Sequence, residues 1–163
     1  MSITNNAAIN EEKVNINRAA IEHRALWLGL LYDEMDKAGA DAEKICREAV
    51  RKCGLFHGEI HKTNCNGSED CRVFKEVFLP ELGLKTFEMQ TEQTEDEVLV
   101  IFHYCPLVNA WKKLGFSDER IAKLCDIAME GDRGIAANNE LKFELGDTIA
   151  SGCATCKMTM SRG

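Results

Sequence analysis

The chain has 163 residues, of which 45% are hydrophobic and 29% charged, and its formal net charge is −7. This length suffices for one domain with a sizeable core, and the composition is typical of a soluble globular protein. The acidic balance, without a cluster of Lys and Arg, argues against nucleic acid and anionic membranes as partners. The first residues lack the pattern of a signal peptide, and no stretch approaches 18 apolar residues. We therefore expect a cytoplasmic protein whose eight cysteines are reduced.

The first half of the chain has a helical pattern. The first ten residues are polar and are expected to be frayed, and apolar residues at helical spacing then predict a helix over residues 8–37. A second helix is predicted from Ala40 to Cys53. The segment after Cys53 is rich in turn residues, and a short helix is expected to begin near Ser68 and to reach Phe78.

The second half alternates strands and helices. An alternating pattern from Leu84, followed by the apolar run Val98–Tyr104, predicts a hairpin. Two helices are predicted next, and two more alternating segments predict strands; these four elements cover residues 106–114, 117–130, 141–145 and 154–160. The sequence therefore predicts an α+β fold, with N-terminal helices followed by a ββααββ unit that forms a four-stranded antiparallel sheet. We expect a helical region of residues 1–80 to pack on a core of residues 81–163, together forming one compact domain.

The junction HYCP places a histidine and a cysteine where the second predicted strand meets a helix. Residues two apart on a strand share a face, so His103 and Cys105 are expected to point the same way. Pro106 suits the first position of a helix, which makes Cys105 the N-cap residue. A thiol at a helix N-terminus beside an imidazole favours the thiolate, the form that attacks carbon or binds a metal. The alternative is a buried cysteine and a core histidine, and the two interpretations are about equally supported.

The remaining cysteines offer further ligands. Cys153 and Cys156 form a CxxC that enters a predicted strand, which weakens a thioredoxin-like interpretation. If a zinc or iron ion is bound, its expected ligands are Cys105, His103, Cys153 and Cys156, but no metal and no other cofactor is favoured.

Three further features are weighed between structural and functional roles. The other cysteines, Cys125 among them, are interpreted as structural or core residues. His57 and His61 are four residues apart, but Gly58 and the turn-like surroundings argue against a helix there and against a pair of ligands. Asp132 lies just past a predicted helix end, either as part of a turn or as a polar group that reaches the site.

Three segments, HYCPLVNAWKKLGF, LCDIAMEGD and TIASGCATCKMTM, resemble the L-2-amino-thiazoline-4-carboxylic acid hydrolase family over roughly residues 75–160. The family pattern of a Cys-Pro pair, a later acidic residue, and a Gly followed by a late Cys matches Cys105-Pro106, Asp132, and Gly152 with Cys156. Two positions depart from the pattern: Cys153 stands where an Asp usually follows the Gly, and Met158 replaces an aromatic residue.

The resemblance implies hydrolytic opening of a cyclic amidine, at the C=N bond of a thiazoline ring, to a carbamoyl-cysteine product. Cys105 would add to the ring carbon or, with His103, orient a water; His103 would transfer protons; Asp132 would hold the positive charge of the amidine. The alternative is a cysteine-rich module that binds a small ligand or a Zn or Fe ion without turnover. A small-molecule substrate is the expected partner, and the long N-terminal helix makes a homodimer possible.

Overall fold

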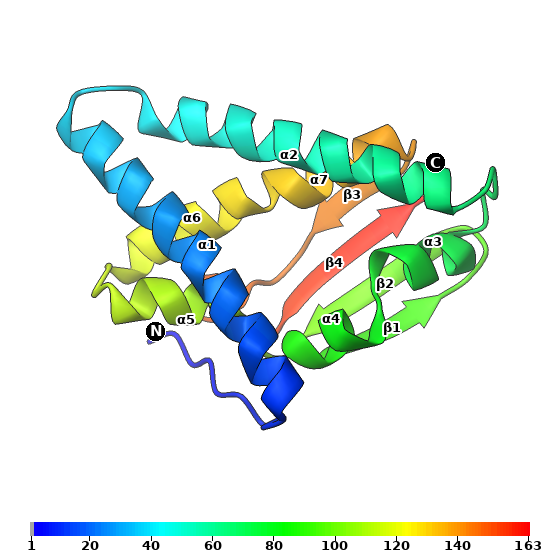
Figure 1. Cartoon of the computed structure of the whole chain (residues 1–163), viewed down its shortest axis with the longest axis horizontal. Helices are drawn as coiled ribbons and strands as arrows, with labels where there is room; N and C mark the ends of the chain where they lie inside the picture. Colours follow the sequence, from blue (N-terminus) through cyan, green and yellow to red (C-terminus); the bar gives the residue numbers. More distant parts are fainter. Residues whose placement is uncertain (1) are drawn as a thin grey trace.

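A computed structural model describes residues 2–163 and shows helices arranged around one four-stranded sheet (Figure 1). The helices are α1 (Glu12–Lys37), α2 (Ala42–Asn64), α3 (Cys71–Phe78), α4 (Glu81–Thr86), α5 (Pro106–Lys113), α6 (Asp118–Ala128), α7 (Glu130–Asn138) and the 3-10 turn η1 (Ile149–Ser151). The strands are β1 (Met89–Gln93), β2 (Glu97–Phe102), β3 (Lys142–Leu145) and β4 (Cys156–Ser161). The predicted α+β class with a four-stranded antiparallel sheet is confirmed.

The sheet has the order β1-β2-β4-β3, and each neighbouring pair is antiparallel. One face is apolar: Val98 and Val100 of β2 are buried and pair in register with Met160 and Met158 of β4. Alternate residues of a strand point to the same side of the sheet, so these apolar side chains gather on one face. Helices cover that face and bury it. The neighbouring positions, such as Gln90 and Lys157, are exposed on the opposite face.

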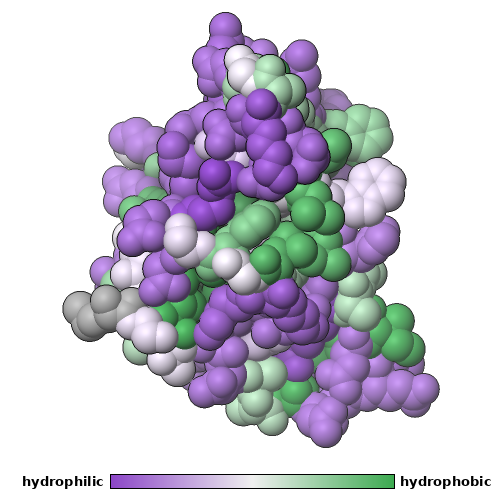
Figure 2. Space-filling view, turned by 90° about the vertical axis from the view of Figure 1, so that its left-hand side faces the viewer, coloured by the Kyte–Doolittle hydropathy of each residue, from purple (hydrophilic) through white to green (hydrophobic). Residues whose placement is uncertain are grey.

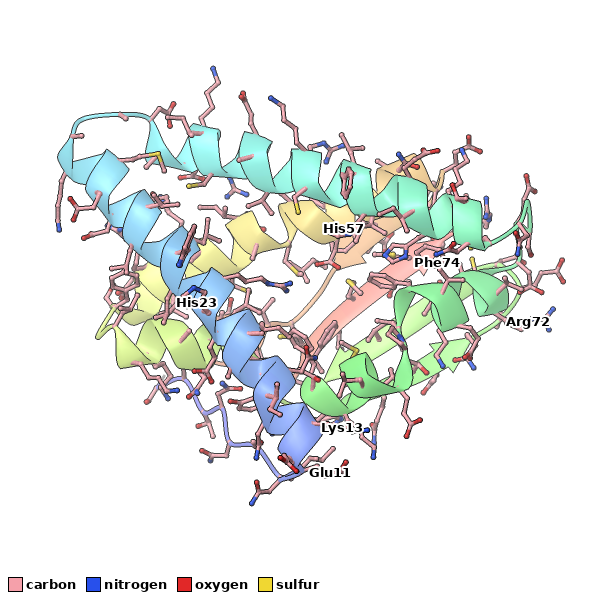
Figure 3. The ribbon with its side chains drawn as sticks, in the orientation of Figure 1. Glu11, Lys13, His23, His57, Arg72 and Phe74 are labelled. Carbon is pink, nitrogen blue, oxygen red and sulfur yellow. The ribbon has the colours of Figure 1, made fainter. Side chains whose placement is uncertain are left out.

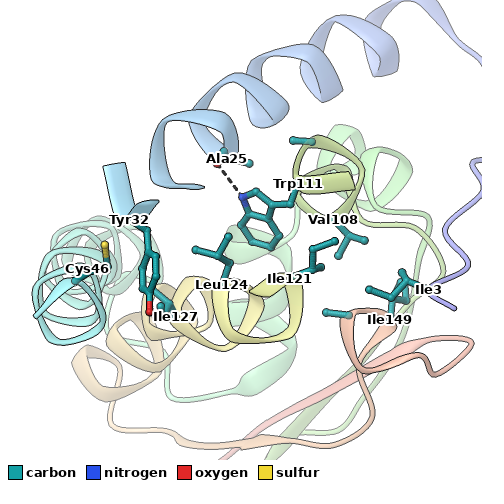
Figure 4. Close-up of a cluster of buried hydrophobic side chains, with 13 residues drawn as sticks. Ile3, Ala25, Tyr32, Cys46, Val108, Trp111, Ile121, Leu124, Ile127 and Ile149 are labelled. Atoms are coloured by element: carbon teal, nitrogen blue, oxygen red, sulfur yellow. Dashed lines mark hydrogen bonds between the residues drawn. The ribbon is translucent and has the colours of Figure 1, made fainter. Parts of the chain in front are cut away.

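A second apolar cluster joins α1, α5 and α6 beside the end of the sheet (Figure 4). At its centre the buried Trp111 of α5 donates a hydrogen bond from Nε1 to the carbonyl of Ala25, at 2.9 Å. This bond satisfies the indole N–H inside the core and ties α5 to α1. Ile3, from the extended N-terminal segment, packs into the same cluster and is only 3% exposed.

The first part of the chain differs from the prediction in three ways. Helix α1 begins at Glu12 rather than residue 8, and the described residues before it are extended rather than frayed, because Ile3 is buried and several backbone groups are hydrogen-bonded. Helix α2 continues to Asn64, well beyond the predicted end at Cys53, so the segment of His57 and Gly58 is helical.

The second half also differs in detail. The alternation from Leu84 predicted a strand, but the chain first completes α4, and β1 begins only at Met89. Strand β2 ends at Phe102, two residues earlier than predicted. Between Ala128 and Lys142 lies one more helix, α7, so the unit has three helices between its two strand pairs. The expected division at residue 80 stays a prediction.

Helices α2 and α7 approach each other closely through glycines. A Cβ atom on Gly54 would lie 2.0 Å from the carbonyl oxygen of Gly131, and one on Gly134 would lie 2.6 Å from the carbonyl oxygen of Arg51. A Cβ on Gly58 would lie 2.8 Å from Cβ of Asn138. Glycine normally weakens a helix, which is why Gly58 argued against one, but here the missing Cβ permits backbone contact between two helices.

Large apolar side chains are exposed on α1, among them Ile16, Trp27 and Leu31. Figure 2 views the molecule from the end where α1 passes into α2 and shows an apolar area in the middle of that face. An exposed apolar stripe on this helix is the feature expected of a docking surface, and homodimerisation stays a prediction. No helix within residues 2–163 is both long enough and apolar enough to cross a membrane.

We expect Gly54→Ala to lower the free energy of unfolding by at least ~2 kcal/mol, because the new Cβ overlaps the backbone of α7 and the helices must separate. Gly131→Ala is the matched control from the same contact, since its Cβ would meet only Cγ1 of Val50, at 3.6 Å. The control should be neutral or slightly stabilising, because alanine favours helix. Urea unfolding measures both, and equal stability of the two variants would contradict the close-contact interpretation.

Candidate functional site

A cavity of about 460 Å³ lies between α1 and α2 on one side and the sheet with α5, α6 and α7 on the other. Most of its wall is apolar, with aromatic side chains from several elements: Phe78, Phe87, Phe102 and Trp111. A few polar groups interrupt this wall. A concave apolar site with a few convergent polar groups is the usual form of a small-molecule pocket.

Cys105 reaches this cavity from the junction between β2 and α5. It is the N-cap residue of α5 and Pro106 occupies the first turn, as predicted. Its backbone is held on both sides: the Cys105 N–H donates to Oδ1 of Asn5 at 2.9 Å, and Nδ2 of Asn5 donates to the Cys105 carbonyl at 2.8 Å. Asn5 belongs to the N-terminal segment, which the sequence analysis did not connect with the site.

His103 does not share this cavity, so the expectation that it faces the same way as Cys105 is wrong. Its side chain is exposed, lies in a shallow surface groove and approaches Oε1 of Gln90 at 3.2 Å. The reason is that β2 ends at Phe102, so residues 103–105 do not continue the alternation of a strand. Phe102 and Cys105 therefore line the same cavity although their separation is odd.

Asp132 and two further thiols converge on the same cavity. Asp132 lies in the first turn of α7, not in a turn beyond a helix, and faces the cavity together with Cys125 of α6 and Cys156 of β4. Cys125, interpreted as a core residue, does pack against the core but also lines the cavity wall. The Sγ atom of Cys156 accepts a hydrogen bond from the backbone N–H of Ile149, at 3.1 Å.

Asn17 and Arg24 of α1 and the two histidines of α2 complete the polar lining. Neither α1 residue was predicted from the sequence, and the histidines were considered there but rejected as a pair of ligands. His57 and His61 are one helical turn apart, and Figure 3 shows His57 on the side of α2 that faces the sheet. Their spacing of four residues was the available signal, and it was set aside because Gly58 argued against helix. Burial, together with the neighbouring His57, lowers the pKa of His61.

Burial controls the protonation of Cys105 more strongly than the helix terminus does. It raises the pKa of the Cys105 thiol to about 12, although the backbone N–H groups of Val108 and Leu107 favour the thiolate. Nearby Cys156 raises this pKa further, and Arg24 opposes the rise. The resting thiol is therefore neutral at physiological pH, contrary to the thiolate expected from the sequence.

Burial also raises the pKa of the Asp132 carboxyl group, to about 6. Arg24 and Arg133 act in the opposite direction, and both are too weak to restore an ordinary value. A carboxyl group that titrates near neutral pH inside a pocket is suited to proton transfer or to pairing with a cationic ligand.

The four residues named as ligands in case a zinc or iron ion is bound do not form one metal site. Within residues 2–163, no group of three or more His, Cys, Asp or Glu side chains is arranged to hold a metal ion. Of the four conditional ligands, Cys105 and Cys156 line the cavity, while His103 lies in the separate groove.

We expect Asp132→Asn to stabilise the protein at pH 8 by up to about 3 kcal/mol, because a pKa raised from 3.8 to about 6 means that folding disfavours the charged form. The gain should disappear as the pH falls from about 6 to below 4, where Asp132 is protonated in both states. Denaturant unfolding at several pH values measures it.

The matched control for this prediction is Asp126→Asn. Burial opposes ionisation of Asp126, but hydrogen bonds from Arg133 and Arg47 outweigh it and lower the pKa. Removing this charge should therefore destabilise the protein at pH 8. If Asp132→Asn also destabilises it, the assigned burial of an unpaired carboxylate is wrong.

Comparison with known proteins identifies the family. The model of the L-2-amino-thiazoline-4-carboxylic acid hydrolase family matches residues 18–160. No curated protein matches the chain significantly. Among solved structures, a trafficking protein particle complex subunit 3 from Naegleria fowleri, covalently bound to palmitic acid, has a similar fold: the TM-score is 0.58 and the identity 14%, over 90% of this chain and 95% of that one. Because the family match spans most of the sequence, this chain belongs to the L-2-amino-thiazoline-4-carboxylic acid hydrolase family.

Proposed function

We propose that the protein hydrolyses a cyclic amidine in the cavity lined by Cys105 and Asp132, opening a thiazoline ring to a carbamoyl-cysteine product. The family match supports a hydrolase. The observation that carries the proposal is the convergence in one pocket of a thiol at a helix N-terminus and a carboxyl group with a raised pKa. His103 has no direct role in this proposal, because it lies in another groove.

Asp132 is suited to hold the amidine. Above pH 6 its carboxylate is charged inside a mainly apolar pocket, and a protonated amidine supplies a compensating positive charge. Both amidine nitrogens carry N–H groups, which match the two oxygens of a carboxylate. Arg24, which reaches the pocket from α1, is the group suited to the carboxylate of an amino-acid-like substrate.

The neutral thiol of Cys105 is compatible with this chemistry. As sulfur adds to the ring carbon, the thiol proton passes to the ring nitrogen, so the pocket gains no net charge. The carbon–nitrogen bond of the ring then breaks and the nitrogen leaves as an amine. Water adds to the thiol-bound carbon and expels the Cys105 sulfur, which recovers its proton. One water is consumed, and a carbamoyl group remains on the substrate sulfur.

Incubation with L-2-amino-thiazoline-4-carboxylic acid, followed by mass spectrometry, tests the reaction. We expect a product heavier by one water, and Cys105→Ser should lower kcat at least ~100-fold because a hydroxyl is a far weaker nucleophile. Cys53→Ser is the matched control, because Cys53 is exposed on α2 and does not line the pocket. Full turnover by Cys105→Ser would eliminate the covalent route.

The pH dependence of kcat/KM tests the role of Asp132. Because the carboxylate is the active form, kcat/KM should fall below pH 6 with an apparent pKa near the Asp132 value of about 6. Asp132→Asn should lower kcat/KM roughly 10- to 1000-fold and remove this acid limb. An unchanged acid limb in the variant would assign the titration to another group.

A second candidate is an apolar-ligand carrier without turnover. The neutral thiols and the mainly apolar wall favour it, and the structurally similar trafficking subunit is covalently bound to palmitic acid. The intact mass of the protein as isolated distinguishes the two: an acyl adduct that hydroxylamine removes supports the carrier. Metal content measured on the same sample tests the zinc or iron alternative.

A further inference from the structure

We infer that Asn5 is a positioning residue for Cys105, and that the extended segment of residues 2–10 is part of the active site's support. The inference rests on the proposed function for its consequence in turnover, but its structural claim concerns Cys105 alone. Asn5 lies before residue 18, where the family match begins.

Asn5 replaces the strand pairing that ends just before Cys105. The N–H groups of His103 and Tyr104 donate hydrogen bonds to the carbonyls of Glu88 and Phe87 respectively. These two bonds continue the contact between the chain segments of β1 and β2 beyond the ends of both strands. At Cys105 this pairing stops, and the Asn5 side chain takes over with one accepted and one donated bond. A partly buried backbone N–H without a partner is costly, so the bond to Asn5 fixes the peptide from which the thiol projects.

The segment that carries Asn5 is itself fixed on both sides. On one side Ile3 is buried, and its carbonyl accepts a hydrogen bond from Nζ of Lys112, at 2.8 Å. On the other side the N–H groups of Ala8 and Ile9 donate to Oε1 of Glu88, at 2.7 and 2.8 Å.

Glu88 is in turn paired with Arg18 at 3.0 Å, and Arg18 also donates to the Ile9 carbonyl at 2.7 Å. This ion pair is almost fully buried, with 7% and 10% of the two side chains exposed. The position of Asn5 is therefore determined by contacts with α1, α5 and the residue before β1. Because the Asn5 side chain is itself held in place, its two hydrogen bonds restrict the position of the Cys105 backbone.

Asn5→Ala tests the inference in the full-length protein. We expect Cys105 to be alkylated at least ~5-fold faster, because its peptide is released, while the alkylation rate of Cys125 stays unchanged. Peptide mapping after timed iodoacetamide treatment measures both thiols in one sample. If the protein is active, kcat should fall about 10-fold with little change in KM. Asn6→Ala is the matched control, because Asn6 is exposed and the Asn side chain that is hydrogen-bonded to the Cys105 backbone is Asn5.

Several outcomes would overturn the inference. Unchanged alkylation and kcat in Asn5→Ala would do so, and so would equal acceleration of Cys105 and Cys125, which indicates general loosening. If Asn5→Ala does not fold, Asn5→Asp is used: it keeps the acceptor for the Cys105 N–H but loses the donor, and it must give an intermediate alkylation rate. Because alkylation requires no substrate, failure of the proposed reaction would leave this test intact.

Discussion

The backbone contact between α2 and α7 is the constraint on which the site depends. Gly54 and Gly134 have no side chain that would separate the two helices, so α7 lies directly against α2. This contact places Asp132, in the first turn of α7, at the wall of the cavity. His57 and His61, on the part of α2 that contacts α7, line the same cavity. If the two helices separated, Asp132 on α7 would move away from His57 and His61 on α2, so the packing of the helices determines the geometry of the site.

The wall of the cavity is mainly apolar, so ionised groups inside it are poorly stabilised, and this limits the protonation states that the proposed reaction can use. Burial keeps the Cys105 thiol neutral and raises the pKa of Asp132 to about 6, so above pH 6 the Asp132 carboxylate is charged but less stable than an exposed carboxylate unless a compensating charge is bound. A substrate that carries its own positive amidine and its own carboxylate would supply partners to Asp132 and Arg24 respectively. Under the proposed function, binding of such a zwitterion would offset the free-energy cost of burying the Asp132 charge, which a neutral molecule would not do.

The sequence predicted the parts of the structure that depend on local patterns. Alternation located β3 and β4, and Pro106 located the start of α5 and the N-cap position of Cys105. It failed where tertiary contact decides the outcome. Gly58 signals a turn locally, but in the protein it permits a helix–helix contact, so α2 was ended too early and the histidines were missed. The early end of β2 reversed the orientation expected for His103, and the role of Asn5 has no local signature because its partner lies 100 residues away.

The most direct test of the proposed site is a crystal structure of the Cys105→Ser variant grown with L-2-amino-thiazoline-4-carboxylic acid. This variant is chosen so that the substrate persists in the crystal. We expect the ligand in the cavity between α1, α2 and the sheet, with its amidine on the Asp132 carboxylate and its ring carbon facing the serine hydroxyl that replaces the Cys105 thiol. Ligand in the groove beside His103, or in the cavity with its amidine turned away from Asp132, would exclude the proposed roles of Cys105 and Asp132.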